Sequence, residues 1–126
     1  MNIDELQAHV REQMKQVAFN PKSLHDPMVR CTDFLTTMAM LNDFIFTCRC
    51  DLARLQTVTE ALFKDAIDHA EGKTVTEKKI GAAAHPEYTN AKEASERIEA
   101  MIKWAKTALD IFNNAHVTYR QTAREG

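Results

Sequence analysis

The sequence predicts an all-α protein in which a short N-terminal helix precedes a long antiparallel helical hairpin of coiled-coil type. Two observations indicate this fold class. The 126 residues include only three glycines and three prolines, which turns and sheets use freely and long helices avoid. Two long segments also place apolar residues at alternating steps of four and three, the spacing of a coiled-coil seam. We expect one helical domain, residues 1–126.

The first predicted helix covers residues 3–19 and is amphipathic. Asn20 and Pro21 end it, because the residue before a proline is disfavoured in the helical conformation. Apolar side chains recur along one side of this segment: Ile3, Leu6, Val10, Met14 and Val17.

A second and much longer helix is predicted over residues 27–71. Asp26 is suited to cap its N-terminus and Pro27 to occupy its first position, where no backbone N–H is needed. At 1.5 Å per residue it would extend roughly 65 Å, which a compact monomer of this size cannot enclose. Its seam consists of Phe34, Met38, Leu41, Ile45, Cys48, Leu52, Leu55, Thr59, Leu62 and Ala66.

The connector, residues 73–85, is expected to contain a short helix that Thr74 and Glu77 begin as a capping box. After Pro86, the last helix is predicted over residues 87–123. Because both long helices share one spacing and a short connector joins them, they are expected to form an antiparallel hairpin. The seam of the last helix, in which alanines allow close approach, is Ala94, Ile98, Met101, Ala105, Ala108, Phe112, Ala115 and Tyr119.

Several large apolar residues lie off both seams and predict self-association. Two helices cannot surround all of these positions, so we expect them to form the interface of a homo-oligomer. The alternative is a monomeric three-helix bundle in which the first helix covers them. The residues of the predicted oligomer interface are Phe44, Phe46, Phe63, Trp104 and Ile111.

The sequence shows no pattern typical of catalysis, a cofactor site or a metal site. The five histidines are scattered over different predicted elements, outside any known motif. Cys31, Cys48 and Cys50 form an odd set without CxxC spacing, which favours a reducing cytoplasm over disulfides or zinc. No apolar run approaches the roughly 20 residues that span a bilayer. We therefore expect a cytoplasmic protein that is not an enzyme and has no cofactor, metal or membrane partner.

The charge balance limits nucleic-acid binding to a local patch. Sixteen Lys and Arg against 18 Asp and Glu give a net charge of −2, which excludes a uniformly basic surface. Basic groups concentrate in the connector, at Lys103 and Lys106, and at the C-terminus. The alternative to phosphate binding is a solvated face with terminal arginines that complement the helix dipole. The predicted phosphate contacts are Lys73, Lys78, Lys79, Arg120 and Arg124.

The layout of the chain resembles the UvsY-type recombination mediators of tailed phages. The residues that carry the resemblance are Leu6-Gln7 on the first helix, the break at Asn20-Pro21, the charged connector from Gly72 to Lys79, Lys103-Trp104 and Tyr119-Arg120. The resemblance implies an oligomeric, ring-forming protein that binds single-stranded DNA. It also implies that the protein helps to load a recombinase onto strands covered by a single-strand binding protein, in the cytoplasm of a bacterial host.

The chain departs from that family in the second half of the long helix, where family members carry a dense run of Lys and Arg. Here Arg49, Arg54 and Lys64 stand among acidic residues such as Asp65 and Asp68. Phosphate binding would then fall to the connector, or the scaffold would serve a protein partner. Two other functions stay open: a phage-encoded adaptor or inhibitor of a host or defence complex, and a small virion assembly protein.

Overall fold

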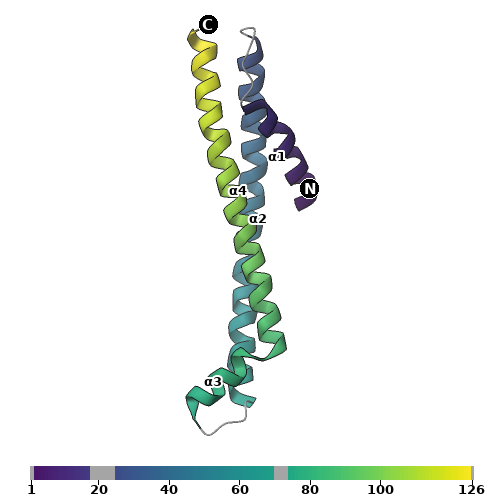
Figure 1. Cartoon of the computed structure of the whole chain (residues 1–126), viewed down its shortest axis with the longest axis vertical. Helices are drawn as coiled ribbons and strands as arrows, with labels where there is room; N and C mark the ends of the chain where they lie inside the picture. The colour runs from purple at the N-terminus through teal and green to yellow at the C-terminus, as the bar shows by residue number, and fades with distance from the viewer. Residues whose placement is uncertain (1, 18–24, 70–73, 126) are drawn as a thin grey trace. The chain divides into compact units, whose positions relative to one another are not determined.

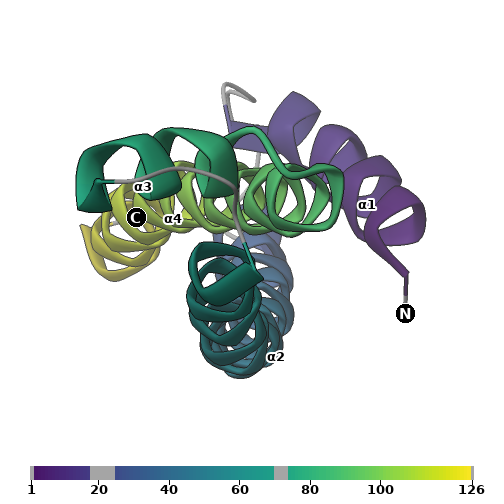
Figure 2. The ribbon, with the colours of Figure 1, turned by 90° about the horizontal axis from the view of Figure 1, so that it is seen from below.

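A computed structural model describes residues 2–17, 25–69 and 74–125 of the chain, and every element within these ranges is an α-helix. The two long helices pack against each other (Figure 1), and they also lie side by side in the view along them (Figure 2). The predicted all-α class and helical hairpin are confirmed. The four helices are α1 (Ile3–Val17), α2 (His25–His69), α3 (Val75–Ala83) and α4 (Pro86–Glu125).

The helix boundaries agree with the predicted ones to within about two residues wherever both can be compared. The expected ends of the first two helices, at residues 18–19 and 70–71, lie outside the described residues. The predicted cap at Asp26 is wrong, because α2 already begins at His25 and residue 26 falls within the first turn. Pro27 also lies in this turn, where a missing N–H costs no helical hydrogen bond. The cap of α3 is confirmed, since the Thr74 hydroxyl accepts from the Glu77 N–H at 3.1 Å.

Two compact units make up the chain, and each long helix contributes to both. Unit 1 consists of Met1–Phe46 and Lys103–Gly126, and unit 2 of Thr47–Ile102. Unit 1 therefore contains three helical segments, since α1 joins the first part of α2 and the last part of α4. Unit 2 contains the remaining parts of α2 and α4 together with the short helix α3.

Unit 1 has a well-buried aromatic and alanine core on the predicted seams. Phe34 and Phe112 are 0% exposed, and their ring centroids lie 5.6 Å apart. Tyr119 meets Phe34 edge-on at 5.4 Å and 82°, a favourable geometry for aromatic pairs. Further buried residues of this core are Leu6, Val10, Leu41, Ile45, Ala105, Ala108 and Ala115.

The seams of unit 2 are buried less completely. Leu52, Leu55 and Leu62 of α2 and Ile98 of α4 are only half-buried, although they continue the same spacing. Two helices can cover only one side of each other, whereas α1 shields the equivalent seam in unit 1. Both predicted seams are therefore confirmed, and they are buried more deeply in unit 1, where α1 packs with its own buried residues Leu6 and Val10.

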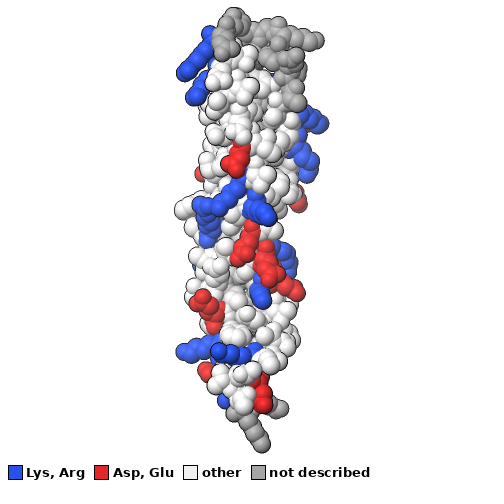
Figure 3. All heavy atoms as spheres, turned by 60° about the vertical axis from the view of Figure 1, so that its left-hand side comes forward, with Lys and Arg blue, Asp and Glu red and all other residues white. Residues whose placement is uncertain are grey.

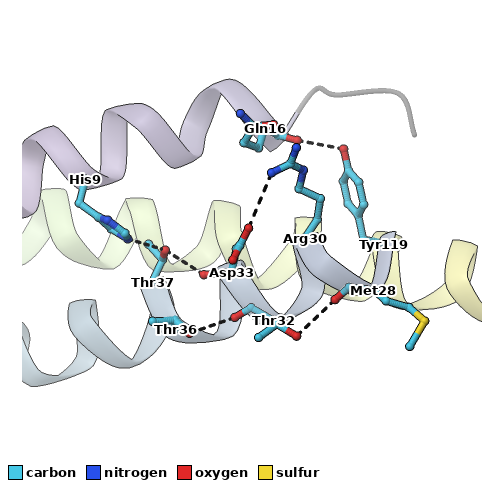
Figure 4. Close-up of polar contacts among 9 residues, drawn as sticks. All are labelled: His9, Gln16, Met28, Arg30, Thr32, Asp33, Thr36, Thr37 and Tyr119. Atoms are coloured by element: carbon cyan, nitrogen blue, oxygen red, sulfur yellow. Dashed lines mark hydrogen bonds and ion pairs between the residues drawn. The ribbon is translucent and has the colours of Figure 1, made fainter. Parts of the chain in front are cut away.

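The C-terminal turn of α1 is tied to α4 by Tyr119 (Figure 4). The Tyr119 hydroxyl donates to the Gln16 carbonyl oxygen at 2.9 Å, and the Val17 carbonyl oxygen lies 3.4 Å away. Carbonyls in the last turn of a helix lack a partner within the helix, so the phenol satisfies groups that α1 cannot satisfy itself. Burial raises the pKa of this phenol, while the charge of Arg30 opposes the rise. The hydroxyl therefore keeps the donated proton throughout the neutral range.

A second polar contact fixes the middle of α1 to α2. His9 Nε2 lies 3.0 Å from Thr37 Oγ1, and the Thr37 side chain is fully buried. The Thr37 hydroxyl donates its own proton to the Asp33 carbonyl oxygen at 3.0 Å. Its oxygen is therefore the acceptor for His9, which must carry a proton on Nε2.

Replacing Tyr119 by phenylalanine is expected to loosen α1 without disturbing the aromatic core. The change removes only the hydroxyl, so unit 1 should lose about 1 kcal/mol, the usual net value of such a hydrogen bond. Hydrogen exchange measured by mass spectrometry should become faster in α1 than in the rest of unit 1. Tyr88→Phe is the control, because the Tyr88 ring packs on Phe63 in unit 2. Equal acceleration of α1 by both variants would contradict the assigned contact.

Candidate functional site

The structure places the predicted phosphate contacts on two different helices. Lys78 is half-buried and Lys79 is exposed on α3 of unit 2, whereas Arg120 and Arg124 are exposed on α4 of unit 1. Lys73 lies outside the described residues. Arg120 and Arg124 are one helical turn apart and therefore project from neighbouring positions of the same helix. The assignment of these five residues to phosphate stays a prediction.

The exposed side of α4 in unit 1 carries more basic than acidic groups. Lys103, Lys106, Arg120 and Arg124 are all exposed, and we call these four residues the α4 basic strip. Asp110 is the one exposed acidic residue between residues 103 and 124 of this helix. In the part of the chain that the structure describes, no ion pair involves a member of the strip. The four positive charges are therefore available to a polyanion.

Each end of the strip consists of two side chains about one turn apart. Lys103 and Lys106 are three residues apart, and Arg120 and Arg124 are four apart, so each pair lies on one side of the helix. At 1.5 Å per residue, the strip covers about 30 Å of helix. Exposed side chains that donate hydrogen bonds lie between or beside the two pairs: Asn113, Asn114 and Gln121. Amide groups of this kind contact phosphates and base edges in protein–nucleic acid complexes.

Lys103 and Lys106 were visible in the sequence as basic residues but were not among the predicted phosphate contacts. Their position relative to the seam of α4 shows that they belong to the same strip. Ala105 and Ala108 are buried against α2, so residues 103 and 106 fall on the outer side of α4 that also carries Arg124.

Among the described residues on the face drawn in Figure 3, basic side chains do not form a continuous surface, because Lys and Arg groups are interspersed with Asp and Glu groups. This mixture fits the net charge of −2. A nucleic acid would therefore meet a local strip of positive charge, as the composition predicts.

Arg120 also lies close enough to α2 to influence a thiol. Burial raises the pKa of the Cys31 thiol, and the positive charge of Arg120 acts in the opposite direction. The Cys31 thiol donates to the His116 carbonyl oxygen at 3.8 Å. Burial likewise raises the pKa of Cys48, and the negative charge of Asp51 adds to the rise. Both thiols stay protonated at neutral pH, a state that suits a packing role and not that of a nucleophile.

The residues of the predicted oligomer interface occupy several environments. Phe46 is 69% exposed and Ile111 is 38% exposed. Phe44 and Trp104 are half-buried and meet edge-on, with ring centroids 6.3 Å apart. Phe63 is half-buried against Tyr88 in unit 2. Phe44 and Phe46 point to nearly opposite sides of α2, because residues two apart are about 200° apart on a helix. The interface stays a prediction, and Phe46 is its most exposed member.

An open pocket of about 360 Å³ lies in unit 2 between α2, α3 and the start of α4. His69 Nδ1 lies 2.9 Å from the Asp65 carbonyl oxygen and 3.3 Å from the Asp65 carboxylate, contacts that raise the pKa of His69. His85 Nδ1 accepts from the Glu87 N–H at the start of α4. The histidines therefore serve local helix-end contacts. The lining residues are Leu62, Asp65, Ala66, His69, Gly81, His85 and Glu87.

No group of three or more His, Cys, Asp and Glu side chains in the described ranges is arranged to hold a metal ion. None of the described helices combines the length and apolar character needed to cross a bilayer.

Comparison of the chain with protein-family models, with curated proteins and with solved structures found no match. The resemblance to UvsY-type mediators therefore rests on the helix layout and residues given above. Within the described residues, the α4 basic strip is the feature with the clearest ligand chemistry.

Proposed function

We propose that this protein is a phage-type accessory protein that self-associates and binds single-stranded DNA through the α4 basic strip. The observation that supports the proposal is the set of four exposed cations on one helical segment, with Asp110 as the one exposed acid among them. Lys and Arg bind a nucleic-acid backbone mainly by charge, so the interaction needs no base-specific geometry. The exposed amides of Asn113 and Asn114 add hydrogen-bond donors between the two basic pairs.

Self-association would strengthen this binding considerably. Four cations per protomer give modest affinity, but several strips on one particle raise the effective concentration of cations around a single strand. An assembly of this kind reconciles a nearly neutral protomer with binding to a polyanion.

We further propose that the bound strand is the substrate for recombinase loading, the role that the resemblance to UvsY-type mediators implies. The protein partners would then be a recombinase or a single-strand binding protein. The helix layout supports this role: a short helix precedes two long ones, α2 and α4, with the short helix α3 between them.

Changing all four residues of the α4 basic strip to alanine is expected to weaken binding to a fluorescent poly-dT oligonucleotide. The dependence of log K on log salt should become shallower by roughly 3, which is about 0.7 for each of four lost phosphate contacts. Fluorescence anisotropy between about 50 and about 200 mM salt measures both affinity and slope. In a second series, the oligonucleotide is first covered with a single-strand binding protein. Loading of a recombinase onto it is then compared between the wild-type protein and the four-alanine variant.

The matched control changes four exposed basic residues of unit 2 to alanine and so alters the net charge equally. These residues are Arg49, Arg54, Lys64 and Lys92. Equal loss of affinity in both variants would contradict the assignment to α4. Absence of binding at low salt, or binding that does not change with salt, would remove the proposed function.

The remaining functions give distinct results in the same experiments. A virion assembly protein would self-associate without affinity for DNA. An adaptor would depend on acidic and aromatic surfaces, so charge reversal of the exposed residues Asp65 and Asp68 would abolish capture of its partner while the α4 variant would not.

A further inference from the structure

The outer side of α2 in unit 1 is almost free of charge. Nine residues between positions 28 and 46 are exposed, and only one of them, Asp43, is charged. The exposed sides of the other two helices of this unit differ, since α1 presents Arg11 and Glu12 and α4 presents the basic strip. An apolar helix face is normally covered by another element. The nine residues are Met28, Val29, Thr32, Leu35, Thr36, Ala39, Asn42, Asp43 and Phe46.

Six of these residues follow a second coiled-coil spacing. Successive members are four, three, four, three and four residues apart, as in the predicted seam of α2 from Phe34 to Ala66, which we call the inner seam. A stripe with this period stays on one side of a helix and fits a second helix that lies nearly parallel to it. We call these six residues the outer seam: Met28, Thr32, Leu35, Ala39, Asn42 and Phe46.

The large residues of the outer seam expose a substantial apolar area. Met28, Leu35 and Phe46 are 63%, 50% and 69% exposed. Side chains of this size have surfaces on the order of 200 Å², so the three together leave roughly 400 Å² in water. Two such patches would bury about 800 Å² in all, which is below the range of stable specific interfaces and within that of weak, transient ones. The size fits a weak dimer that forms as the protein concentration rises.

The hydroxyl groups of this face are already satisfied within the helix (Figure 4). Thr32 donates to the Met28 carbonyl oxygen at 3.3 Å, and Thr36 donates to the Thr32 carbonyl oxygen at 3.1 Å. A buried donor without a partner opposes association, whereas these two donors need none from another chain. Asn42 is the one outer-seam residue whose side chain still requires a partner on burial.

We propose that the outer seam pairs with the same seam of a second copy in antiparallel orientation. Centred on Thr37, this arrangement places Leu35 opposite the Ala39 position of the second copy, so a large side chain meets a small one. Met28 lies opposite Phe46, a favourable pairing of sulfur with an aromatic ring. Asn42 lies opposite Thr32, whose hydroxyl oxygen retains acceptor capacity for the amide. Each residue type thus finds its complement in one symmetric dimer.

The antiparallel orientation is favoured over the parallel one by charge and size. Parallel seams would place each residue against itself, so that Ala39 would face Ala39 and Phe46 would face Phe46. The Asp43 carboxylates, which border the seam, would also lie at the same level. Antiparallel helices separate these like charges and oppose their helix dipoles. The outer seam lies on α2 and the basic strip on α4, so the two surfaces have no residue in common.

The main test is sedimentation velocity on the full chain over a wide range of concentration. The wild-type protein should shift from monomer to dimer as its concentration rises. Leu35→Glu and Phe46→Glu should each weaken the dimer by more than about tenfold, because each would place a carboxylate in the dry interface. Circular dichroism should show unchanged helix content, since both residues are at least half exposed. The matched control is Ile111→Glu on α4 of the same unit, which should dimerise like the wild type.

The orientation has its own test, by disulfide cross-linking in a Cys50→Ser background. A mixture of Met28→Cys and Phe46→Cys chains should form the mixed disulfide, because these positions face each other only in the antiparallel dimer. Preferential formation of the Met28→Cys homodisulfide would overturn the antiparallel arrangement.

Three results would overturn the outer-seam dimer. The first is a wild-type protein that stays monomeric at all concentrations. Binding of lipid vesicles or of a helical peptide to this face of the monomer would have the same meaning. The second is an oligomer that Leu35→Glu and Phe46→Glu leave intact. The third is an oligomer that Ile111→Glu disrupts to the same extent. Anisotropy with the poly-dT oligonucleotide on the same variants reports DNA binding separately.

Discussion

Replacing Phe34 by alanine is expected to lower the free energy of unfolding of unit 1 by about 3 to 5 kcal/mol, the range for removal of a buried aromatic side chain. Phe34 is fully buried and contacts two other rings of the core, those of Phe112 and Tyr119. The substitution removes both aromatic contacts and leaves a cavity. The three packed helices of unit 1 cannot move far enough to close it. Since small domains are stable by only about 5 to 15 kcal/mol, this loss should bring unit 1 close to unfolding.

Trp104 makes the measurement specific to unit 1. It is the only tryptophan in the chain, and it lies in unit 1 with its ring edge-on to Phe44. Urea unfolding followed by Trp104 fluorescence therefore reports the loss of packing within this unit. The control is Phe46→Ala on the same helix, which removes the same atoms from a side chain that is 69% exposed. At low protein concentration, Phe46→Ala should change stability by less than about 0.5 kcal/mol. Similar losses in the two variants would contradict the assigned core.

The contrast between Phe34 and Phe46 shows how much of the fold the sequence predicts. Both are phenylalanines on one helix, and only their positions in the four-three spacing distinguish them. Phe34 belongs to the predicted inner seam and is buried. Phe46 lies off that seam and is exposed. Periodicity predicts these environments well because a helix fixes the angular position of every side chain along its length.

The position of α1 could not be predicted in the same way. Its amphipathic pattern shows that one side needs a partner, but not which helices supply it. The partners become clear only from contacts between residues far apart in sequence, such as Tyr119 with Gln16 and His9 with Thr37. This packing explains why the seams are buried deeply in unit 1 and only partly in unit 2.

Only part of the α4 basic strip could be proposed from the sequence. Arg120 and Arg124, which the sequence singles out, are exposed as a phosphate site would require. The contribution of Lys103 and Lys106 depends on which side of α4 faces α2, and therefore on the burial of Ala105 and its neighbours. The outer seam was missed for a different reason. Its polar members Thr32 and Asn42 interrupt the apolar pattern, and the internal hydrogen bond of Thr32 is a property of the folded helix.

Replacing Ala105 by leucine should destabilise unit 1 by about 1 to 3 kcal/mol, the usual cost of overpacking a tightly packed core. Ala105 is fully buried and Ala108 is 3% exposed. Small side chains at these positions let α2 and α4 approach closely, so three additional carbon atoms have no space between the helices. Leucine and alanine have similar helix propensities, and a change in stability therefore reports packing and not helix formation.

Ala8→Leu provides the matched control for this substitution. Ala8 lies on α1 of the same unit, and it is exposed. Its replacement adds the same atoms without entering the seam, so Trp104 fluorescence should show an unfolding midpoint in urea close to that of the wild type. A leucine at position 105 that left the midpoint unchanged, or raised it, would mean that the two helices are farther apart at this level than their alanine seam implies. The space between α2 and α4 would then have room for larger side chains. The alanines of α4 would in that case not be needed for close approach of the two backbones.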